Sequence, residues 1–348
     1  MLALTFHGEE TIQCETVADP EILDARDAIV AVSSTAICGS DLHVYHCREK
    51  GLDMGTTMGH EFTGTVVEIG SAVQNIRKGD RVVSPFTTSC GSCFYCRAGL
   101  TCRCTQGALF GWVEGGQGLQ GAQAQYVRVP LADGSLFPLP EDVGEEEGLL
   151  LGDILATGYF AADGAGIKPG GTYVVLGCGP VGLMGIVGAR ELGAERLYAV
   201  DCIPERLTLA QSYGAIPIDF SKQDPAELIR ETTQGLGADA VMELVGSASA
   251  SRLAMDLIRP GGTISIAGVH TEPHFAFSPG EAYDKNITLR IGRCPARFYM
   301  ERLLPLVRQR KYDLGAIFSH RLPLQQGAEG YDIFAKRLQC CTKVILKP

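Results

Sequence analysis

The stretch TYVVLGCGPVG, residues 172–182, decides the fold of the chain around it. Its apolar first half, Thr172–Leu176, predicts a buried strand, and the pattern that follows predicts a helix over Val181–Leu192. Between them stands a G-x-G-x-x-G turn. The first glycine allows a tight turn, the second lets a pyrophosphate come close, and the third lets the helix pack against the strand. The N–H groups at the start of such a helix bind phosphates. We therefore predict a dinucleotide-binding turn made of Gly177, Gly179, Pro180, Val181 and Gly182.

An acidic residue, Asp201, ends the next predicted strand, Arg196–Asp201. A carboxylate at this place can accept hydrogen bonds from both hydroxyls of an adenosine ribose and would repel a 2′-phosphate. Glycine-rich turns also occur without any ligand, but the strand, turn, helix and acid together favour a cofactor site. The pattern indicates NAD rather than NADP.

Strands and helices alternate through the part of the chain that begins at about residue 155, which predicts a parallel sheet with right-handed crossovers. The further elements expected there are a helix over Glu205–Tyr213 and strands over Ala238–Val245 and Thr263–Ala267. The sequence therefore predicts an α/β fold for this part.

The chain before about residue 150 has short β-like runs separated by Gly, Pro and Asp, which is an all-β pattern. After about residue 293 the alternation stops, and a predicted helix and final strand must pack back on another part of the chain. We expect two domains, residues 1–154 with 294–348 and residues 155–293. The β-like runs are Ala28–Val32, Gly64–Ile69, Arg81–Ser84 and Tyr126–Val129, and the last two elements are the helix Met300–Arg308 and the strand Thr342–Leu346.

Four of the 13 cysteines follow the spacing C-x2-C-x2-C-x7-C in one segment. Four thiolates at short spacing suit a closed tetrahedral zinc site with no position left for water, so the predicted zinc is structural. Cys102 lies close enough to replace the last ligand, and the spacing leaves this alternative open. The predicted ligands are Cys90, Cys93, Cys96 and Cys104.

The 348 residues carry a formal net charge of −10, with 45% hydrophobic and 20% charged residues. A strongly acidic chain disfavours nucleic acid and anionic membranes as partners, because both repel negative charge. No apolar run is long enough for a membrane span, and no secretory signal is evident. We expect a cytoplasmic protein with no nucleic-acid or membrane partner.

A second, sparser set of metal-ligand residues surrounds Cys38 and His60. Either residue alone is more often structural than a ligand. The polar neighbours Ser40, Asp41, His43 and Glu61 make a metal site the better interpretation.

These segments resemble the zinc-containing medium-chain dehydrogenase/reductase family of alcohol dehydrogenases. The resemblance covers essentially the whole chain and is closest to the bacterial and archaeal secondary-alcohol dehydrogenases. It implies a GroES-like β-barrel catalytic domain beside a Rossmann domain with a doubly wound parallel sheet, and a homo-oligomer, either tetramer or dimer. The matching stretches are CGSDLH, GHEFTGTVVEIG, GDRV, the four-cysteine segment, LATGY, VVLGCGPVGLM, Cys294-Pro295, MERL, Trp112 and the terminal KVIL.

The resemblance implies roles for particular residues. Cys38, His60 and Asp153 would bind a catalytic zinc, with Asp41 orienting His60. Glu61 would approach or join the metal, and Ser40 and His43 would relay the proton. Thr157 would contact the nicotinamide and Lys343 the pyrophosphate, and the pocket walls would be Phe86, Trp112 and Cys294.

This sequence departs from the family pattern in one place. Some secondary-alcohol dehydrogenases use NADP and have a small uncharged residue with a nearby Arg after the second strand, whereas this chain has Asp201-Cys202-Ile203-Pro204. The expected cofactors are two zinc ions per chain and NAD, and the expected reaction is hydride transfer between NAD and a small secondary alcohol or diol.

Three alternatives remain open from the sequence. The first is a polyol or formaldehyde dehydrogenase on the same scaffold. The second is a zinc-stabilised binding module without catalysis, which would explain the four cysteines alone. The third is a nicotinamide-binding protein that has lost catalysis.

Overall fold

The segment in which strands alternate with helices forms a unit of its own. The computed structural model describes residues 1–348 and divides them into one unit of Met1–Asp153 with Pro295–Pro348 and a second of Ile154–Cys294. These boundaries lie one residue from those expected from the sequence. Each unit is described by itself below.

The Ile154–Cys294 unit contains a six-stranded sheet in the order β12-β11-β10-β13-β14-β15, with every neighbouring pair parallel. This is the doubly wound order, in which the direction of winding reverses between β10 and β13. All five residues of β10 are buried, as expected for a parallel strand that is covered on both faces. Its strands are β10 (Thr172–Leu176), β11 (Arg196–Asp201), β12 (Ile216–Asp219), β13 (Ala238–Glu243), β14 (Ile258–Ile266) and β15 (Thr288–Ile291).

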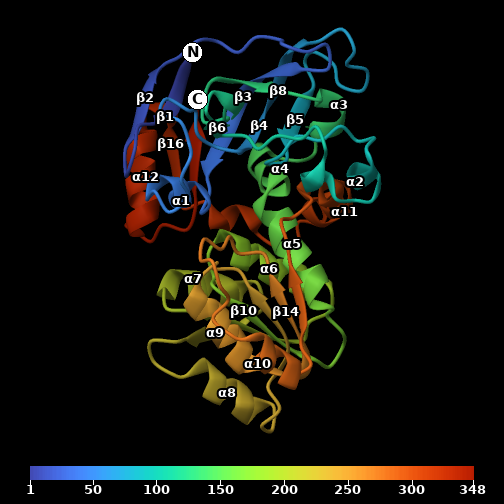
Figure 1. Cartoon of the computed structure of the whole chain (residues 1–348), viewed down its shortest axis with the longest axis vertical. Coiled ribbons are helices and arrows are strands. Elements are labelled where there is room, and N and C mark those ends of the chain that lie inside the picture. The colour runs from blue at the N-terminus through green and yellow to red at the C-terminus, as the bar shows by residue number, and fades with distance from the viewer. The chain divides into compact units, whose positions relative to one another are not determined.

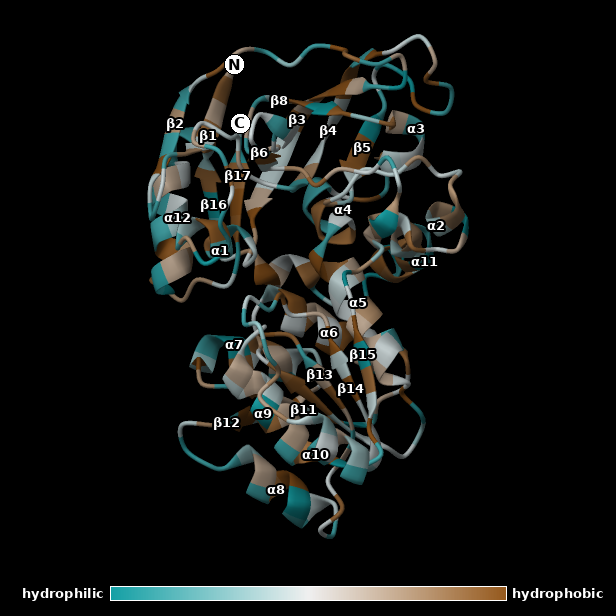
Figure 2. Ribbon diagram, viewed as in Figure 1, coloured by the Kyte–Doolittle hydropathy of each residue, from teal (hydrophilic) through white to brown (hydrophobic).

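Helices between these strands complete the unit (Figure 1) and pack against the sheet to form its core. Apolar residues of α8 and α9, among them Ile229 and Met255, pack with Val174, Val241 and Ile264 of the sheet. Figure 2 shows hydrophobic stretches in β13 and β14, whereas α8 also carries hydrophilic residues. The helices are α5 (Ile154–Ala165), α6 (Pro180–Glu191), α7 (Pro204–Ser212), α8 (Pro225–Thr232), α9 (Ala248–Leu257) and α10 (Pro279–Asp284).

The other unit is built on a mixed sheet in the order β16-β17-β3-β4-β5-β9, with β8 also paired to β3. Strand β3 is the centre of this sheet, because it pairs with β4, β8 and β17. The last strand of the chain thus lies beside β3, so the C-terminal segment packs back on the first part of the chain as the sequence suggested. The strands are β3 (Ala28–Ile37), β4 (Glu61–Ile69), β5 (Arg81–Ser84), β8 (Tyr126–Val129), β9 (Phe137–Pro138), β16 (His320–Pro323) and β17 (Val344–Lys347).

Two small antiparallel hairpins and several short helices complete this unit. The hairpins are β1 (Leu2–Phe6) with β2 (Ile12–Thr16) and β6 (Trp112–Glu114) with β7 (Gln117–Leu119). The helices are α1 (Asp41–Tyr45), α2 (Phe94–Arg97), α3 (Ala132–Ser135), α4 (Glu145–Gly152), α11 (Ala296–Gln309) and α12 (Gly327–Lys336), with 3-10 turns η1 (Thr101–Arg103), η2 (Leu314–Ile317) and η3 (Leu324–Gln326). None of the helices in the chain combines the length and the apolar character that crossing a bilayer requires.

Candidate functional site

The antiparallel pairing of β3 with β4 brings two of the predicted ligands together. Ala36 pairs with Glu61 in this ladder, so Cys38, just after β3, and His60, just before β4, lie beyond the same end of it. Both side chains are buried, with 7% of Cys38 and 9% of His60 exposed. Two residues far apart in the sequence are thus held by backbone hydrogen bonds of one sheet.

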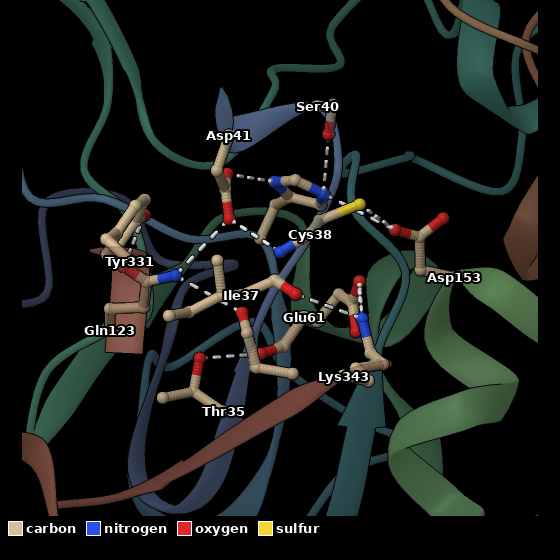
Figure 3. A network of polar contacts seen from close by, with 12 residues as sticks. Thr35, Ile37, Cys38, Ser40, Asp41, Glu61, Gln123, Asp153, Tyr331 and Lys343 are labelled. Atoms are coloured by element: carbon tan, nitrogen blue, oxygen red, sulfur yellow. Dashed lines mark hydrogen bonds and ion pairs between the residues drawn. The ribbon is translucent and has the colours of Figure 1, made fainter. Parts of the chain in front are cut away.

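The third predicted ligand comes from a break between two helices. Asp153 ends α4 in a non-helical conformation, immediately before α5 begins at Ile154. Its Oδ2 atom lies 3.5 Å from Cys38 Sγ and 3.3 Å from His60 Nε2 (Figure 3). One ligand atom from each of Cys38, His60, Glu61 and Asp153 lies within 4.8 Å of all the others, which is a spacing that a single metal ion can bridge.

The chemistry of these donors fits a divalent cation. Burial, together with the charges of Asp153 and Glu61, raises the pKa of the Cys38 thiol to about 11. A thiol, an imidazole and two carboxylates are buried together here, and zinc accepts sulfur, nitrogen and oxygen ligands of these types. Asp41 Oδ1 lies 3.2 Å from His60 Nδ1, so the other ring nitrogen, Nε2, faces the cluster.

Glu61 forms a buried ion pair with Lys343, and this corrects one expectation. Lys343 Nζ lies 2.8 Å from Glu61 Oε1 and 3.2 Å from the carbonyl oxygen of Ile37, and both charged side chains are 0% exposed. An ammonium group without exposed surface does not offer itself to a cofactor pyrophosphate, as Lys343 was expected to do. Its position instead compensates the buried charge of Glu61.

The second carboxylate oxygen of Glu61 supports the metal interpretation. Glu61 Oε2 is buried and has no hydrogen-bond partner. Burial raises the pKa of Glu61 to about 7, although the Lys343 ammonium acts to lower it. A buried carboxylate oxygen without a donor is costly, and a cation in the cluster would remove that cost.

The residues expected to relay a proton lie in and beside the short helix α1. Ser40 precedes α1, and its Oγ lies 3.3 Å from His60 Nε2, on the side that faces the ligand cluster. His43 lies within α1 and its backbone N–H donates to the Ser40 carbonyl. The structure therefore brings Ser40 to the cluster and places His43 one helical turn beyond it.

The three expected pocket residues lie in different surroundings. Phe86 is buried, and its ring centroid lies 6.3 Å from that of His60 in an edge-to-face arrangement. Trp112 packs against the core formed by β1, β2 and α12. Cys294 is 2% exposed and belongs, like Thr157 of α5, to the Ile154–Cys294 unit. Of the three, Phe86 is the one that the structure places beside a predicted metal ligand.

The four-cysteine segment forms a separate cluster. One sulfur atom from each of Cys90, Cys93, Cys96 and Cys104 lies within 4.8 Å of the others, and Cys102 is not part of this group. Backbone N–H groups point at the sulfurs: Cys90 N donates to Cys104 Sγ at 3.2 Å, and Cys93 N donates to Cys90 Sγ at 3.3 Å. Hydrogen bonds from the backbone of Cys96 and Thr105 lower the pKa of Cys93 to about 6, which favours the thiolate that zinc binds.

The glycine turn after β10 is tight and leaves open space at the start of α6. Gly177 has φ +84°, and a Cβ atom on Gly182 would overlap the Gly177 carbonyl oxygen, so both positions need glycine. A Cβ atom on Gly179 would meet only Arg206 Nη1, at 3.8 Å, which leaves room at the start of α6 for a ligand.

Asp201 is tied to this turn. Its Oδ2 accepts a hydrogen bond of 2.7 Å from Cys178 N, and its Oδ1 accepts bonds from Cys202 N and Ile203 N. The carboxylate is 7% exposed and retains acceptor sites beyond these three bonds. Asp201 therefore joins the end of β11 to the turn after β10.

Comparison with known proteins identifies the family. Residues 24–141 match the family model "Alcohol dehydrogenase GroES-like domain", and residues 180–308 match "Zinc-binding dehydrogenase". Zinc-type alcohol dehydrogenase B of Aspergillus flavus is 46% identical over an alignment of 357 residues, which covers 100% of this chain and 81% of the relative. The chain belongs to the zinc-containing alcohol dehydrogenase family.

Two further relatives bear on this member of the family. The structure of alcohol dehydrogenase TADH from Thermus sp. ATN1 has a TM-score of 0.92 and 38% identity, and the match covers 100% of this chain and 99% of that one. The NADP-dependent isopropanol dehydrogenase of Thermoanaerobacter brockii is 34% identical over 302 residues, covering 84% of each chain. The predicted fold, a GroES-like domain with a Rossmann domain, is confirmed. Membership of the family makes the chain a zinc-binding oxidoreductase but does not decide between NAD and NADP.

Sequence reasoning missed the partners of this dehydrogenase's buried polar groups. Nothing near Lys343 signalled that it faces Glu61, because the two residues are separated by most of the chain. Gln123 and Tyr331, which are both 0% exposed and lie behind Asp41, were not singled out either. The one available signal was a polar residue inside a largely apolar run, as at Gln123 in GAQAQYV, which also contains Gln125.

Proposed function

We propose that the protein is an NAD-dependent zinc alcohol dehydrogenase that interconverts a small secondary alcohol or diol and the corresponding carbonyl compound. The observation that carries the proposal is the buried cluster of Cys38, His60 and Asp153, with the Ser40 hydroxyl beside it. A structural role would not require a hydroxyl group at the metal-facing nitrogen of His60.

The catalytic zinc would be held by Cys38, His60 and Asp153. Alcohol dehydrogenases are themselves a standard example of a catalytic zinc with three protein ligands, so this part of the reasoning is inherited from the family. When bound, the zinc lowers the pKa of the substrate hydroxyl and the nicotinamide accepts the hydride. The buried Glu61 oxygen can supply a further ligand, and the Lys343 ammonium limits how negative the cluster becomes.

The chain's own residues would then handle the proton and exclude water. Ser40 is placed to accept the proton of the alcohol, and His43 to pass it towards solvent, since histidine titrates near neutral pH. Phe86 covers the His60 ring and provides an apolar wall for the alkyl group of a substrate. The pocket roles of Trp112 and Cys294 stay predictions from the resemblance.

The choice of NAD rests on Asp201. Its carboxylate stands at the end of β11, where it would meet the hydroxyls of the adenosine ribose and repel a 2′-phosphate. The pyrophosphate would bind over Gly177, Gly179 and the start of α6, and Thr157 is proposed to contact the nicotinamide. Arg206 lies close to Gly179 and offers a positive charge to the same phosphates.

A homo-oligomer is proposed from the edge of the parallel sheet. Strand β15 pairs only with β14 along this edge, and all four of its residues are exposed, including Leu289 at 37% and Ile291 at 55%. An exposed edge strand with apolar side chains is a ready surface for a second copy. Light scattering should give the mass of a dimer or tetramer, and a monomer would contradict this part. The cytoplasmic location stays a prediction.

The proposal is tested by a substrate screen that follows NADH or NADPH formation. The panel is 2-propanol, 2,3-butanediol, sorbitol and formaldehyde, each with NAD and with NADP. The proposal expects the highest kcat/KM for 2-propanol or 2,3-butanediol with NAD. Preference for sorbitol or formaldehyde would move the protein to the polyol or formaldehyde dehydrogenases of the same scaffold. No turnover of any alcohol by zinc-loaded protein would contradict the proposal.

A further inference from the structure

A chain of buried hydrogen bonds runs from helix α12 to the predicted zinc ligands (Figure 3). The Tyr331 hydroxyl donates to Gln123 Oε1 at 2.8 Å. Gln123 Nε2 donates to Asp41 Oδ2 at 3.3 Å, and Asp41 Oδ1 lies 3.2 Å from His60 Nδ1. Tyr331 and Gln123 are 0% exposed and Asp41 is 5% exposed, so water does not compete for these bonds.

The neighbours of the Gln123 amide fix its orientation. Its nitrogen faces two acceptors, the Asp41 carboxylate at 3.3 Å and the Ala36 carbonyl at 3.2 Å. Its oxygen faces the Tyr331 hydroxyl, which supplies a proton. A flipped amide would point its oxygen at the Asp41 and Ala36 oxygens, so two of the three hydrogen bonds would be lost and only one, to the Tyr331 hydroxyl oxygen, could remain.

Asp41 connects this chain to two predicted ligands at once. Its Oδ2 atom accepts a bond of 2.9 Å from the backbone nitrogen of Cys38, in addition to the bond from Gln123. Its Oδ1 atom faces the Nδ1 nitrogen of His60. A rotation of the Asp41 carboxylate would therefore disturb the orientation of His60 and the backbone that carries Cys38.

Gln123 also touches the backbone that carries His60. Gly59 has φ +89°, and a Cβ atom at this position would overlap Cγ of Gln123. The Gln123 backbone nitrogen donates to the Met58 carbonyl at 2.8 Å. The Gln123 side chain thus fills the space directly behind the segment 58–60, and its amide reaches past that segment to Asp41.

We propose that Gln123, supported by Tyr331, is a positioning residue that holds the Asp41 carboxylate and thereby sets how tightly the Cys38–His60–Asp153 cluster retains zinc. This rests on the proposed catalytic zinc. Gln123 touches no ligand side chain through its amide, so it acts through Asp41. Replacing a residue that hydrogen-bonds directly to a metal ligand, as Asp41 does, commonly changes metal affinity by about 10–100-fold, and Gln123 lies one hydrogen bond further out.

Two variants remove successive bonds of the chain and a third serves as the matched control. Gln123→Met keeps the length of the side chain and removes its hydrogen bonds to Asp41, Ala36 and Tyr331. Tyr331→Phe keeps the ring and removes only the hydroxyl behind Gln123. Tyr45→Phe also removes a tyrosine hydroxyl, from a buried ring 5.4 Å from that of Tyr331, but this hydroxyl donates to the partly exposed Asp332 and lies outside the hydrogen-bond chain.

The experiment follows zinc transfer from the full-length protein to a chromogenic chelator. We expect the four-cysteine zinc to give a second, slower phase, which serves as an internal reference. We expect Gln123→Met to accelerate the catalytic-site phase about tenfold and Tyr331→Phe about threefold, with Tyr45→Phe unchanged and the slow phase constant in all variants. In the Co²⁺-substituted protein the visible bands of the catalytic site should change with Gln123→Met and stay the same with Tyr45→Phe.

The outcomes separate the two proposals. A wild-type protein that holds only the four-cysteine zinc would overturn the proposed function, and this inference with it. Two zinc ions in the wild type, with Gln123→Met and Tyr331→Phe releasing the first at the wild-type rate, would overturn the inference alone. Equal acceleration of both phases would mean that the substitution destabilises the whole protein, and this would also overturn the inference. If Gln123→Met does not fold, the milder Tyr331→Phe decides the question by the same criteria.

Discussion

The two predicted zinc sites of this chain are built in opposite ways. The four-cysteine site takes all its ligands from residues 90–104 of one segment, and its sulfurs accept bonds from backbone N–H groups of that same segment. The other site collects Cys38, His60 and Asp153 from the ends of two strands and a break between two helices. A local set of ligands suits a site that only stabilises, whereas a dispersed set lets the surrounding fold shape the access to the metal.

The two sites also differ in the burial and charge of the groups around their ligands. Around the dispersed site, Glu61, Lys343 and Asp41 are buried charged groups that hold one another or a ligand. The four-cysteine site has three partly exposed ligands and neutral amide donors. Buried charges cost free energy unless they are paired, so the dispersed site is the more sensitive to any single substitution. The predictions below test this contrast.

The largest effect is expected for Cys38→Ser. Loss of a catalytic metal removes several kcal/mol of transition-state stabilisation, and each 1.36 kcal/mol is tenfold in rate, so turnover should fall by about a thousandfold or more. Zinc content should fall to one ion per chain, while NAD binding, measured by calorimetry, should survive. Normal turnover in Cys38→Ser would show that the dispersed site is not the reaction centre.

Cys93→Ser should act on stability instead of on the reaction. A zinc ion present at about a hundred times its dissociation constant adds ~2.7 kcal/mol to the free energy of unfolding. Losing it corresponds to a fall in Tm of ~5–11 °C for a domain of this size. Turnover at low temperature should stay close to that of the wild type, and scanning calorimetry measures the shift. A variant that keeps its Tm but loses turnover would reverse the roles assigned to the two sites.

Asp201 should control the choice of cofactor without affecting either metal. Asp201→Ser removes the charge that would repel a 2′-phosphate and should shift the ratio of kcat/KM for NAD over NADP by about 10–100-fold towards NADP. Asp201→Asn also removes the charge but keeps an oxygen that can accept the bond from Cys178 N, so it separates the loss of charge from the loss of that bond. An unchanged ratio in both variants would place the discrimination elsewhere.

The smallest effect is expected for Asp153→Cys. A thiolate is a softer ligand for zinc than a carboxylate, so release of the catalytic zinc to a chelator should slow by a modest factor, about fivefold. The rate for the four-cysteine zinc should not change. Faster release from Asp153→Cys than from the wild type would argue that Asp153 is not a ligand.

The contrast between the sites also explains what the sequence could predict. The cysteine spacing identified one site without any fold, and the turn Gly177–Gly182 with the strand ending at Asp201 identified the cofactor unit, because both signals are local. Cys38 and His60 were candidates only through their polar neighbours, and Asp153 came from the resemblance alone, since nothing nearby separates it from other acidic residues. Asp153 meets the others only after α4 packs against the mixed sheet.

Long-range pairing of buried polar groups lay beyond sequence reasoning altogether. Lys343 was expected to face a pyrophosphate and instead faces Glu61, because β17 pairs with β3 and carries the neighbouring lysine into the site. Gln123 lies in a loop, and only the folded chain shows that its amide meets Asp41 and Tyr331. Such contacts depend on which distant segments the fold brings together, and a local sequence pattern does not show this.

The most direct test of the account is a chelator titration of the wild-type protein in which zinc content, turnover and Tm are measured on the same samples. The account predicts two zinc ions per chain, loss of turnover in proportion to the first ion removed, and a fall in Tm mainly with the second. Full turnover after removal of the first ion, or a single zinc in the untreated protein, would contradict it.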